Sequence, residues 1–402
     1  MKKLSNFING KSVESTSGET TTLVNPATGQ PFATAPKSNA ADIDAAFKAA
    51  SDAFVDWRDS TPSQRQRALL KIADAIEARA DEVIAIEVEN TGKPVSLTTS
   101  EEVPPMVDQI RFFAGAARNL EGKSAGEYMP GMTSMIRREP VGVIGQVTPW
   151  NYPMMMAVWK WAPAIAAGNT VVLKPSDTTP ASTVWMANLM AEFLPAGVFN
   201  VVCGERETGA SLVNHKRPDM VSITGSVGAG IQVAESAAKQ VKRVHLELGG
   251  KAPVVVFADA DLAAAAEAIA IAGYFNAGQD CTAATRVIVQ DSVYQEFVAL
   301  LTEQAKAIAI GAPHDEDVFL GPVNNSNQLA RVSDLLSRVP AHAQVMTGGS
   351  ALDRPGFFFP ATVVAGLAQN DELIQKEIFG PVITVQKFTD EAQAVSMANG
   401  VD

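Results

Sequence analysis

The stretch VGVIGQVTPWNYPMMMAVWKWAPAIAAGNTVVLKPSD (residues 141–177) decides the fold class. A short β-rich apolar run lies near each end, at 141–147 and 170–173, and a helix-like apolar segment (155–167) lies between them. Neither run alternates apolar with polar residues, which is typical of strands covered on both faces. The stretch therefore predicts two parallel strands joined by a crossover helix.

The same alternation of strand and helix continues along the chain. Further β-rich runs and helix-like segments follow at 181–194, 199–202, 220–223, 228–240, 244–248 and 254–257. A long Ala-rich helix is predicted over 262–273, and a second set of strands and helices begins near Arg286. We therefore expect an α/β fold with a domain boundary close to residue 250.

The first 140 residues predict smaller elements. Residues 20–30 read as a short strand closed by a turn, and residues 124–140, which carry two glycines, read as a hairpin. Asp42 is expected to cap a helix that continues to Trp57. A second helix is predicted from apolar residues spaced three or four apart and ending before Gly92: Leu69, Ile72, Ile76, Ala80 and Val83.

Composition excludes several classes of protein. A length of 402 residues predicts two or more domains. The net charge of −12 argues against nucleic acid or an anionic membrane as partner. The two cysteines suit a reducing cytosol, and the four scattered histidines lack metal-ligand spacing. The N-terminus lacks the apolar core of a signal peptide, so we expect a cytoplasmic protein without a metal.

Cys281, in the segment GQDCT (278–282), is a candidate nucleophile. Small and polar residues precede it and suit a tight turn that leaves a thiol approachable. An arbitrary cysteine is more often a small buried hydrophobe, but the polar neighbours of Cys281 favour the reactive interpretation. Cys203 lies in an apolar run, and for this residue we keep the interpretation of a buried side chain.

Several polar groups follow predicted strands, where parallel sheets bind ligands. Glu247 is a candidate general base, or else a solvated strand-end carboxylate. Asn151 offers an amide donor for an oxyanion, or else belongs to a rigid turn between two prolines. Lys174, Ser176 and Asp177 are candidates to hold a ribose. The turn that begins at Gly225 and Ser226 opens a helix where phosphate can bind, a weak signal by itself.

The order and spacing of six motifs resemble the NAD(P)-dependent aldehyde dehydrogenase superfamily. These are PWNYP (149–153), LKPSD (173–177), ITGSVGAG (223–230), LELGGKAP (246–253), NAGQDCTAATR (276–286) and KEIFGPV (376–382). The resemblance covers essentially the whole chain. It implies two Rossmann-like domains, with NAD binding at 1–123 and 141–249 and catalysis at 250–402. It also implies an oligomerisation hairpin at 124–140 and a homodimer or homotetramer.

The resemblance also implies a mechanism. Cys281 would attack the aldehyde to give a thiohemiacetal, with Asn151 and the Cys281 backbone N–H stabilising the oxyanion. Hydride transfer to nicotinamide would leave a thioester, and Glu247 would activate the water that hydrolyses it. The implied cofactor contacts are Trp150, Lys174, Ser176, Asp177, Gly225, Ser226, Leu248, Glu377 and Phe379. A carboxylate at Asp177 would bind ribose hydroxyls and repel a 2′-phosphate, which favours NAD over NADP.

Within the superfamily, Asp280, the run CTAATR (281–286) and RFFAGAAR (111–118) resemble the γ-aminobutyraldehyde dehydrogenases of putrescine breakdown. An acidic site mouth can hold a substrate ammonium, with Asp280 as first candidate and Asp108, Glu101 and Glu102 on a predicted entrance helix. Trp159, Met155 and Met156 are expected to line an apolar tunnel.

Two alternatives stay open. One is oxidation of succinic or another semialdehyde, against which stands the lack of an obvious basic pocket near Asp280. The other is a non-catalytic, truncated relative. Family members continue well past the position of Asp402, and the chain stops in a predicted helix (390–399), so the resemblance implies a catalytic domain that is incomplete at its C-terminal end.

Overall fold

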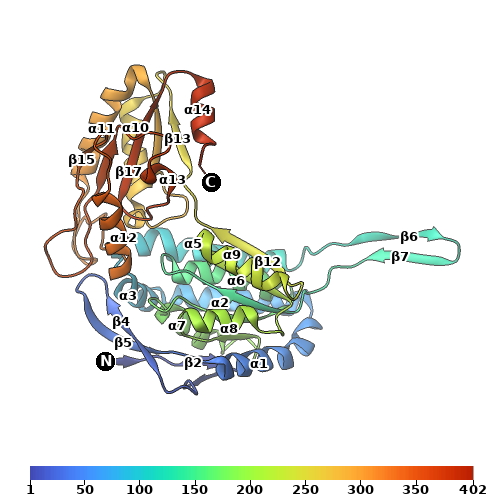
Figure 1. Ribbon diagram of the computed structural model, residues 1–402. Helices are drawn as coiled ribbons and strands as arrows, with labels where there is room; N and C mark the ends of the chain where they lie inside the picture. Colours follow the sequence, from blue (N-terminus) through green and yellow to red (C-terminus); the bar gives the residue numbers. More distant parts are fainter. Residues whose placement is uncertain (402) are drawn as a thin grey trace. The chain divides into compact units, whose positions relative to one another are not determined.

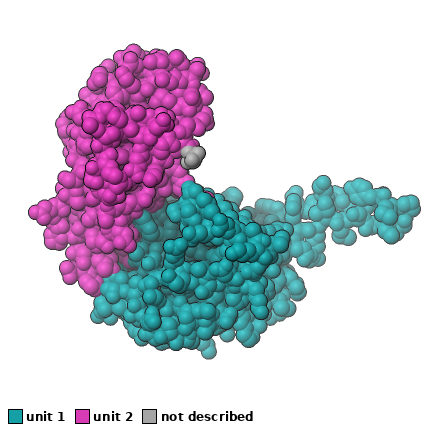
Figure 2. Space-filling view, viewed as in Figure 1, with its two compact units in different colours: residues 1–23, 32–87, 99–247 teal, residues 24–31, 88–98, 248–402 magenta. Residues whose placement is uncertain are grey.

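The computed structural model describes residues 1–401, which fall into two compact units (Figures 1 and 2). Unit 1 comprises Met1–Leu23, Phe32–Glu87 and Thr99–Glu247; unit 2 comprises Val24–Pro31, Val88–Thr98 and Leu248–Asp402. The two short segments at 24–31 and 88–98 group with unit 2, whereas the resemblance implied that they belong to the NAD-binding domain. Within residues 1–401, no helix combines the length and the apolar character that crossing a membrane requires.

Unit 1 is built on a seven-stranded sheet in the order β12-β11-β8-β9-β10-β2-β3. The four central strands are parallel: β11 (Met220–Gly225), β8 (Val143–Val147), β9 (Thr170–Lys174) and β10 (Phe199–Val201). β12 (Arg243–Leu248) lies beside β11, and β2 (Asn6–Ile8) and β3 (Lys11–Val13) add antiparallel strands at the other side. The predicted parallel sheet with crossover helices is confirmed.

Alternate residues of these strands face opposite helix layers. Val143, Val172 and Val221 share one apolar cluster with Phe47 and Leu212. That face is covered by α1 (Ala40–Arg58), α8 (Arg206–Asn214) and α9 (Val227–Ala238). The opposite face carries α6 (Pro153–Ala166), whose Lys160 carbonyl accepts from the Gln146 amide of β8 at 2.8 Å.

The remaining elements of this half of the chain are short strands and helices. They are β1 (Lys2–Lys3), β4 (Thr20–Asn25), β5 (Gln30–Pro36), α2 (Pro62–Ala78), α3 (Ala80–Thr91), α4 (Val95–Leu97), η1 (Thr98–Glu102), α5 (Val103–Ala116) and α7 (Ala181–Met190). The predicted hairpin is present as β6 (Lys123–Met129) and β7 (Met132–Ile136), which pair antiparallel. It extends away from the helices of unit 1 (Figure 1), and all five residues of β7 are exposed.

Unit 2 contains a five-stranded sheet in the order β13-β14-β17-β16-β15. β13 (Pro253–Val256), β14 (Arg286–Gln290), β17 (Val382–Phe388) and β16 (Thr362–Ala365) are parallel, and β15 (Gln344–Thr347) is antiparallel. The other elements are α10 (Leu262–Tyr274), η2 (Phe275–Gly278), η3 (Asp291–Val293), α11 (Tyr294–Ala307), α12 (Ser326–Ser337), α13 (Glu372–Gln375) and α14 (Glu391–Ala398).

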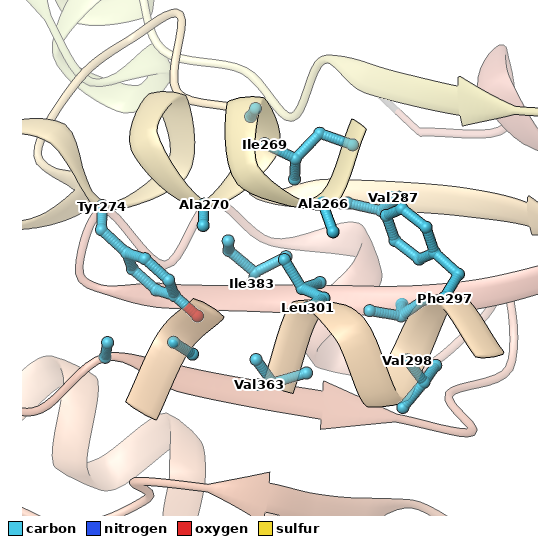
Figure 3. Packing of buried hydrophobic residues seen from close by; sticks show 14 of the residues in the cluster. Ala266, Ile269, Ala270, Tyr274, Val287, Phe297, Val298, Leu301, Val363 and Ile383 are labelled. Atoms are coloured by element: carbon cyan, nitrogen blue, oxygen red, sulfur yellow. The ribbon is translucent and has the colours of Figure 1, made fainter. Parts of the chain in front are cut away.

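Strand alternation again decides which helix meets which face. Val287, Val363 and Ile383 pack with Phe297 and Leu301 of α11, and α10 joins them in one core (Figure 3). The neighbouring residues in each strand point the other way, toward α12 or α14. Both faces of the sheet are therefore buried, which explains why its strands are apolar runs without polar alternation.

Two local predictions are wrong, each for a physical reason. Asn39, not Asp42, is the N-cap of α1; Asp42 is the third helical residue and completes a capping box. The single helix predicted across Ala80 is two helices, because the backbone leaves helical geometry at Arg79 (φ −116°, ψ 28°). Glu101 and Glu102 lie in the π-helical turn η1 before α5, and Glu102 is fully buried.

Candidate active site

Cys281 follows a left-handed turn that comes directly after α10. Asn276, Ala277 and Gly278 have φ of 48°, 56° and 67°, a region that favours glycine. Space also requires a glycine at 278, since a Cβ there would lie 2.1 Å from the Gly380 carbonyl oxygen. The turn therefore fixes the position from which the backbone presents the thiol.

Buried amides hold this turn in place. The Asn276 side-chain amide donates to the Gln279 carbonyl at 3.2 Å, and the Gln279 amide donates to the Asn276 carbonyl at 3.0 Å. Gln279 Oε1 accepts from the backbone N–H of Asn324 at 2.8 Å. These bonds close the turn on itself and attach it to a second loop of unit 2, so the thiol is carried by a rigid segment.

The two cysteines differ in accessibility. Cys281 is half-buried, whereas Cys203, just after β10, is 1% exposed. Burial raises the pKa of the Cys203 thiol to about 12, despite the nearby Lys174 ammonium. The prediction that Cys203 is a buried side chain is confirmed, and Cys281 is the thiol that solvent reaches.

Hydrogen bonds to Thr282 hold the side chain of Asp280, the residue that precedes Cys281 in the sequence. Its Oδ1 accepts from the backbone N–H and from the hydroxyl of Thr282, both at 2.7 Å. This is the arrangement of an Asx turn, in which an aspartate bonds the backbone two residues later. The carboxylate is half-buried, so it faces solvent in part.

Unit 2 also contains the predicted cofactor residues Leu248, Glu377 and Phe379. Glu377 Oε1 accepts from the Gly250 N–H at 3.3 Å, and burial raises the pKa of the Glu377 carboxyl. A Cβ on Gly249 would lie 2.3 Å from Glu377 Oε2, so a glycine is needed there for this approach. Phe379 has a left-handed φ of 59°, which marks a tight bend after Glu377.

In unit 1, the predicted polar groups gather at one edge of the sheet. Trp150 and Asn151 follow β8, Lys174 ends β9, Ser226 follows β11, and Glu247 lies near the end of β12. Because β8, β9 and β11 are parallel, their carboxyl ends meet at the same edge. Asn151 is buried there, and Glu247 is half-buried.

A cavity of about 690 Å³ opens on the α8 and α9 face of this sheet. Its lining includes the ends of β8, β9 and β11, the start of α9 and one side of α8: Val147, Lys174, Arg206, Gly209, Ala210, Val213, Asn214, Ile223, Ser226, Gly228, Ala229, Gln232, Val233, Glu235, Ser236 and Lys239. This volume and mixture of apolar walls with a few polar groups are typical of a small-molecule site.

The cavity has open space at the amino end of a helix, where an anionic ligand group is favoured. Ser226 caps α9 and accepts from the Ala229 N–H at 3.3 Å, so the amino end of the helix faces the cavity, where anions are favoured. A Cβ on Gly228 would meet nothing within 4 Å, which leaves open space at that end. Lys174 reaches the cavity with its stem, while its Nζ donates to the carbonyls of Pro175 (2.7 Å) and Gly204 (2.6 Å).

The structure brings together part of the predicted cofactor set. Lys174 and Ser226 line the cavity, whereas Ser176 and Asp177 do not; Ser176 Oγ donates to Asp177 Oδ1 at 3.2 Å. Burial lowers the pKa of Lys174. Sequence reasoning missed the wall that α8 forms and the part of the α9 wall from Gln232 to Lys239, since these residues belong to no motif and have the mixed polarity of an ordinary helix surface.

The predicted substrate residues of unit 1 lie on two helices that pack together, α5 and α6. Asp108 is exposed on α5, and Trp159 is 45% exposed on α6. Met155 and Met156 are buried on α6. Along residues 1–401, no three His, Cys, Asp or Glu side chains gather in a group that suits a metal ion.

Comparison with known proteins agrees with this architecture. The sequence model of the aldehyde dehydrogenase family matches residues 12–402. An aldehyde dehydrogenase from Bacillus cereus, solved as an NAD⁺ complex, is 34% identical over 100% of this chain and 82% of its own, with a TM-score of 0.96.

Two further solved structures have different substrates in their names. Lactaldehyde dehydrogenase from Escherichia coli is 37% identical over 100% of this chain and 84% of its own, with a TM-score of 0.96. A point mutant of betaine aldehyde dehydrogenase from Staphylococcus aureus, in complex with NAD⁺, is 34% identical over 100% of this chain and 83% of its own, with a TM-score of 0.97. The chain therefore belongs to the aldehyde dehydrogenase family of NAD-dependent enzymes.

Proposed function

We propose that this enzyme oxidises an ω-amino aldehyde such as 4-aminobutanal to the corresponding amino acid. The observation that carries the proposal is the Asp280 carboxylate, which is held by Thr282 and immediately precedes the Cys281 thiol. A carboxylate next to the reacting group attracts a substrate ammonium and repels a substrate carboxylate. The lactaldehyde and betaine aldehyde relatives show only that substrate class varies at this level of identity.

The proposed chemistry begins with Cys281. Its thiolate sulfur adds to the aldehyde carbon, and the resulting oxyanion accepts hydrogen bonds from the Asn151 amide and the Cys281 backbone N–H. NAD, when bound, supplies the hydride acceptor that converts this thiohemiacetal into a thioester. Glu247 then takes a proton from a water molecule, whose oxygen attacks the thioester carbon; the C–S bond breaks and releases the acid and the Cys281 thiolate.

Each unit carries some of the residues proposed to contact the cofactor. In unit 1, Lys174 and Ser226 would hold NAD at the cavity, with Gly225, Trp150, Ser176 and Asp177 nearby along the chain; in unit 2, Leu248, Glu377 and Phe379 would contribute. Residues 1–123 and 141–249 remain the proposed NAD-binding domain, and residues 250–402 the proposed catalytic domain. We keep NAD over NADP because the carboxylate at Asp177 would repel a 2′-phosphate.

Three further residues are proposed to contact the substrate. Exposed Asp108 adds negative charge on α5, while Trp159 and Met155 of α6 supply apolar surface for the methylene chain. An amino aldehyde carries both features, an ammonium and a short hydrocarbon.

We also propose that the enzyme is a homodimer or homotetramer in the cytoplasm. The hairpin β6–β7 is the expected contact, since an isolated two-stranded hairpin with exposed apolar residues is marginal in water. The two free cysteines suit a reducing compartment.

The test compares substrates of matched length and different charge. We expect NADH production with 4-aminobutanal, with a higher kcat/KM than with neutral pentanal and a much higher one than with succinic semialdehyde. Asp280→Asn should lower kcat/KM for 4-aminobutanal about five- to tenfold, the size of one partly exposed ion pair. The same variant should leave pentanal oxidation nearly unchanged.

Two outcomes would decide against the proposal. A higher kcat/KM for succinic semialdehyde than for 4-aminobutanal would refute the amino aldehyde substrate. If the wild type and Cys281→Ser were equally inactive while folded, the catalytic roles would be wrong.

A further inference from the structure

A hydrogen-bonded chain of three side chains crosses the α6 face of the unit 1 sheet. The Lys160 ammonium of α6 donates to the Ser222 hydroxyl of β11 at 2.9 Å. Ser222 Oγ lies 3.0 Å from Nδ1 of His245, on the adjacent strand β12. With the imidazole proton on Nε2, Nδ1 accepts from the Ser222 hydroxyl, and the chain is complete from the ammonium to the ring.

Glu247 belongs to the same face. Side chains alternate along a strand, so His245 and Glu247, two residues apart in β12, point to the same side of the sheet. Ser222 and Gln146 are register partners in β11 and β8, and the Gln146 amide donates to the Lys160 carbonyl. Lys160 is therefore fixed at both its backbone and its ammonium, on the face that carries the proposed general base.

The groups of this chain influence one another electrostatically. Burial lowers the pKa of Lys160 to about 8, and the Glu247 carboxylate opposes that shift. Burial and the Lys160 ammonium lower the pKa of His245 from 6.5, again opposed by Glu247. The charged groups that act on His245 are Lys160 of α6 and Glu247 of its own strand, and Arg243 shares their side of β12 by strand alternation; β11 contributes the neutral Ser222.

We propose that His245 is a positioning residue for Glu247, acting through Ser222 and Lys160. Neutral His245 orients the Ser222 hydroxyl, which then accepts from the Lys160 ammonium and keeps this charge in place beside the base. Protonated His245 donates instead of accepting, so the Ser222 hydroxyl meets two cations and the chain breaks. The inference rests on the proposed role of Glu247 in hydrolysis.

The hydrogen-bonded chain from Lys160 through Ser222 to His245 can be tested without any activity measurement. The protein has four histidines, so ¹³Cε1 labelling gives four ring signals to follow with pH. We expect His245 to titrate below its ordinary value, and its midpoint to rise toward about 6.5 in both Lys160→Met and Ser222→Ala. His215, which is stacked on Phe47 and paired with Asp44, is the internal control and should not move. An unchanged His245 midpoint in both variants would overturn the coupling.

The positioning role is tested with two substitutions of the same residue. His245→Asn keeps an acceptor near the place of Nδ1 but cannot titrate. The kcat of this variant should therefore stay near that of the wild type at pH 8. At lower pH, its kcat should not show the fall that protonation of His245 causes in the wild type. His245→Leu removes the acceptor and should lower kcat about three- to tenfold at pH 8. His215→Asn should keep the wild-type pH profile.

The outcomes separate the inference from the proposed function. Equal kcat and equal pH profiles for wild type, His245→Asn and His245→Leu, in an active enzyme, would refute the positioning role. An inactive wild type would refute the proposed function and with it the role toward Glu247, while the histidine titration would still decide whether the chain couples its three groups.

Discussion

Gly278→Ala should be the most informative single substitution in unit 2. The residue has φ +67°, and a Cβ would lie 2.1 Å from the Gly380 carbonyl oxygen. Holding alanine in a left-handed conformation costs about 1–2 kcal/mol, and forcing a methyl group into filled space costs about 1–3 kcal/mol. The backbone carbonyl cannot rotate away as a flexible side chain would, so we expect a loss near the middle of the sum, about 3 kcal/mol.

Two measurements check this expectation. In a domain of this size, about 3 kcal/mol lowers Tm by roughly 6–12 °C. The turn also carries the thiol, and a displacement of about 1 Å can lower kcat about 10²-fold. Thermal unfolding followed by circular dichroism and NADH production should therefore both change.

Gly115→Ala is the matched control. Gly115 lies in α5, has an ordinary φ, and a Cβ there would meet nothing within 4 Å. This variant should be unchanged or stabilised by up to about 1 kcal/mol. If Gly278→Ala kept the wild-type Tm and kcat, the argument from space and backbone conformation at this turn would be refuted.

Three other predictions concern thiols, a helix start and the cavity. A thiol reagent should label one cysteine in the folded protein, Cys281, and reach Cys203 only on unfolding; rapid labelling of both would contradict the burial difference. Burial alone would raise the pKa of Asp42, but hydrogen bonds, first that from Ser15, hold it below 3.8. Its stabilising effect is therefore present above that pH and lost as the pH falls through the folded pKa, so Asp42→Asn should lower stability in urea by about 1 kcal/mol at pH 7 and by progressively less as the pH falls through that pKa. Ser226→Ala should lower stability by about 1 kcal/mol and weaken NAD binding in calorimetry. Ser226→Gly should lower stability by only about a few tenths of a kcal/mol, because glycine is tolerated at helix caps; equal losses of stability in the two variants would contradict the capping role.

The parts of the fold that were predictable depend on continuous apolar runs. Strands β8 and β9 lie close to their predicted positions because both of their faces are buried. Helix α8 was missed because its sequence, RETGASLVN, is polar over most of its length and buries chiefly Leu212 and Val213. The break at Arg79 was hidden because apolar spacing continues across it, and backbone geometry alone separates the two helices.

In the candidate site, too, some residues were predictable from the sequence and others were not. Motifs placed at strand ends led to Lys174 and Ser226, which line the cavity. Partners that depend on the register between strands had no sequence signal: nothing in the chain order relates Lys160, Ser222 and His245, which come from α6, β11 and β12. Such a group is found only when the sheet order is known.

The hairpin β6–β7 carries a natural chemical reporter. Its three methionines, Met129, Met132 and Met135, are 59%, 60% and 68% exposed, while the methionines of α6 are buried. Peroxide converts an accessible methionine to its sulfoxide, which adds one oxygen atom to the mass of the peptide. Oxidation of the hairpin peptide therefore reports whether this surface is covered, and slow oxidation would support the proposed contact between subunits. Where the hairpin joins subunits as proposed, oxidation of these methionines would weaken the contact, because a polar sulfoxide replaces an apolar thioether.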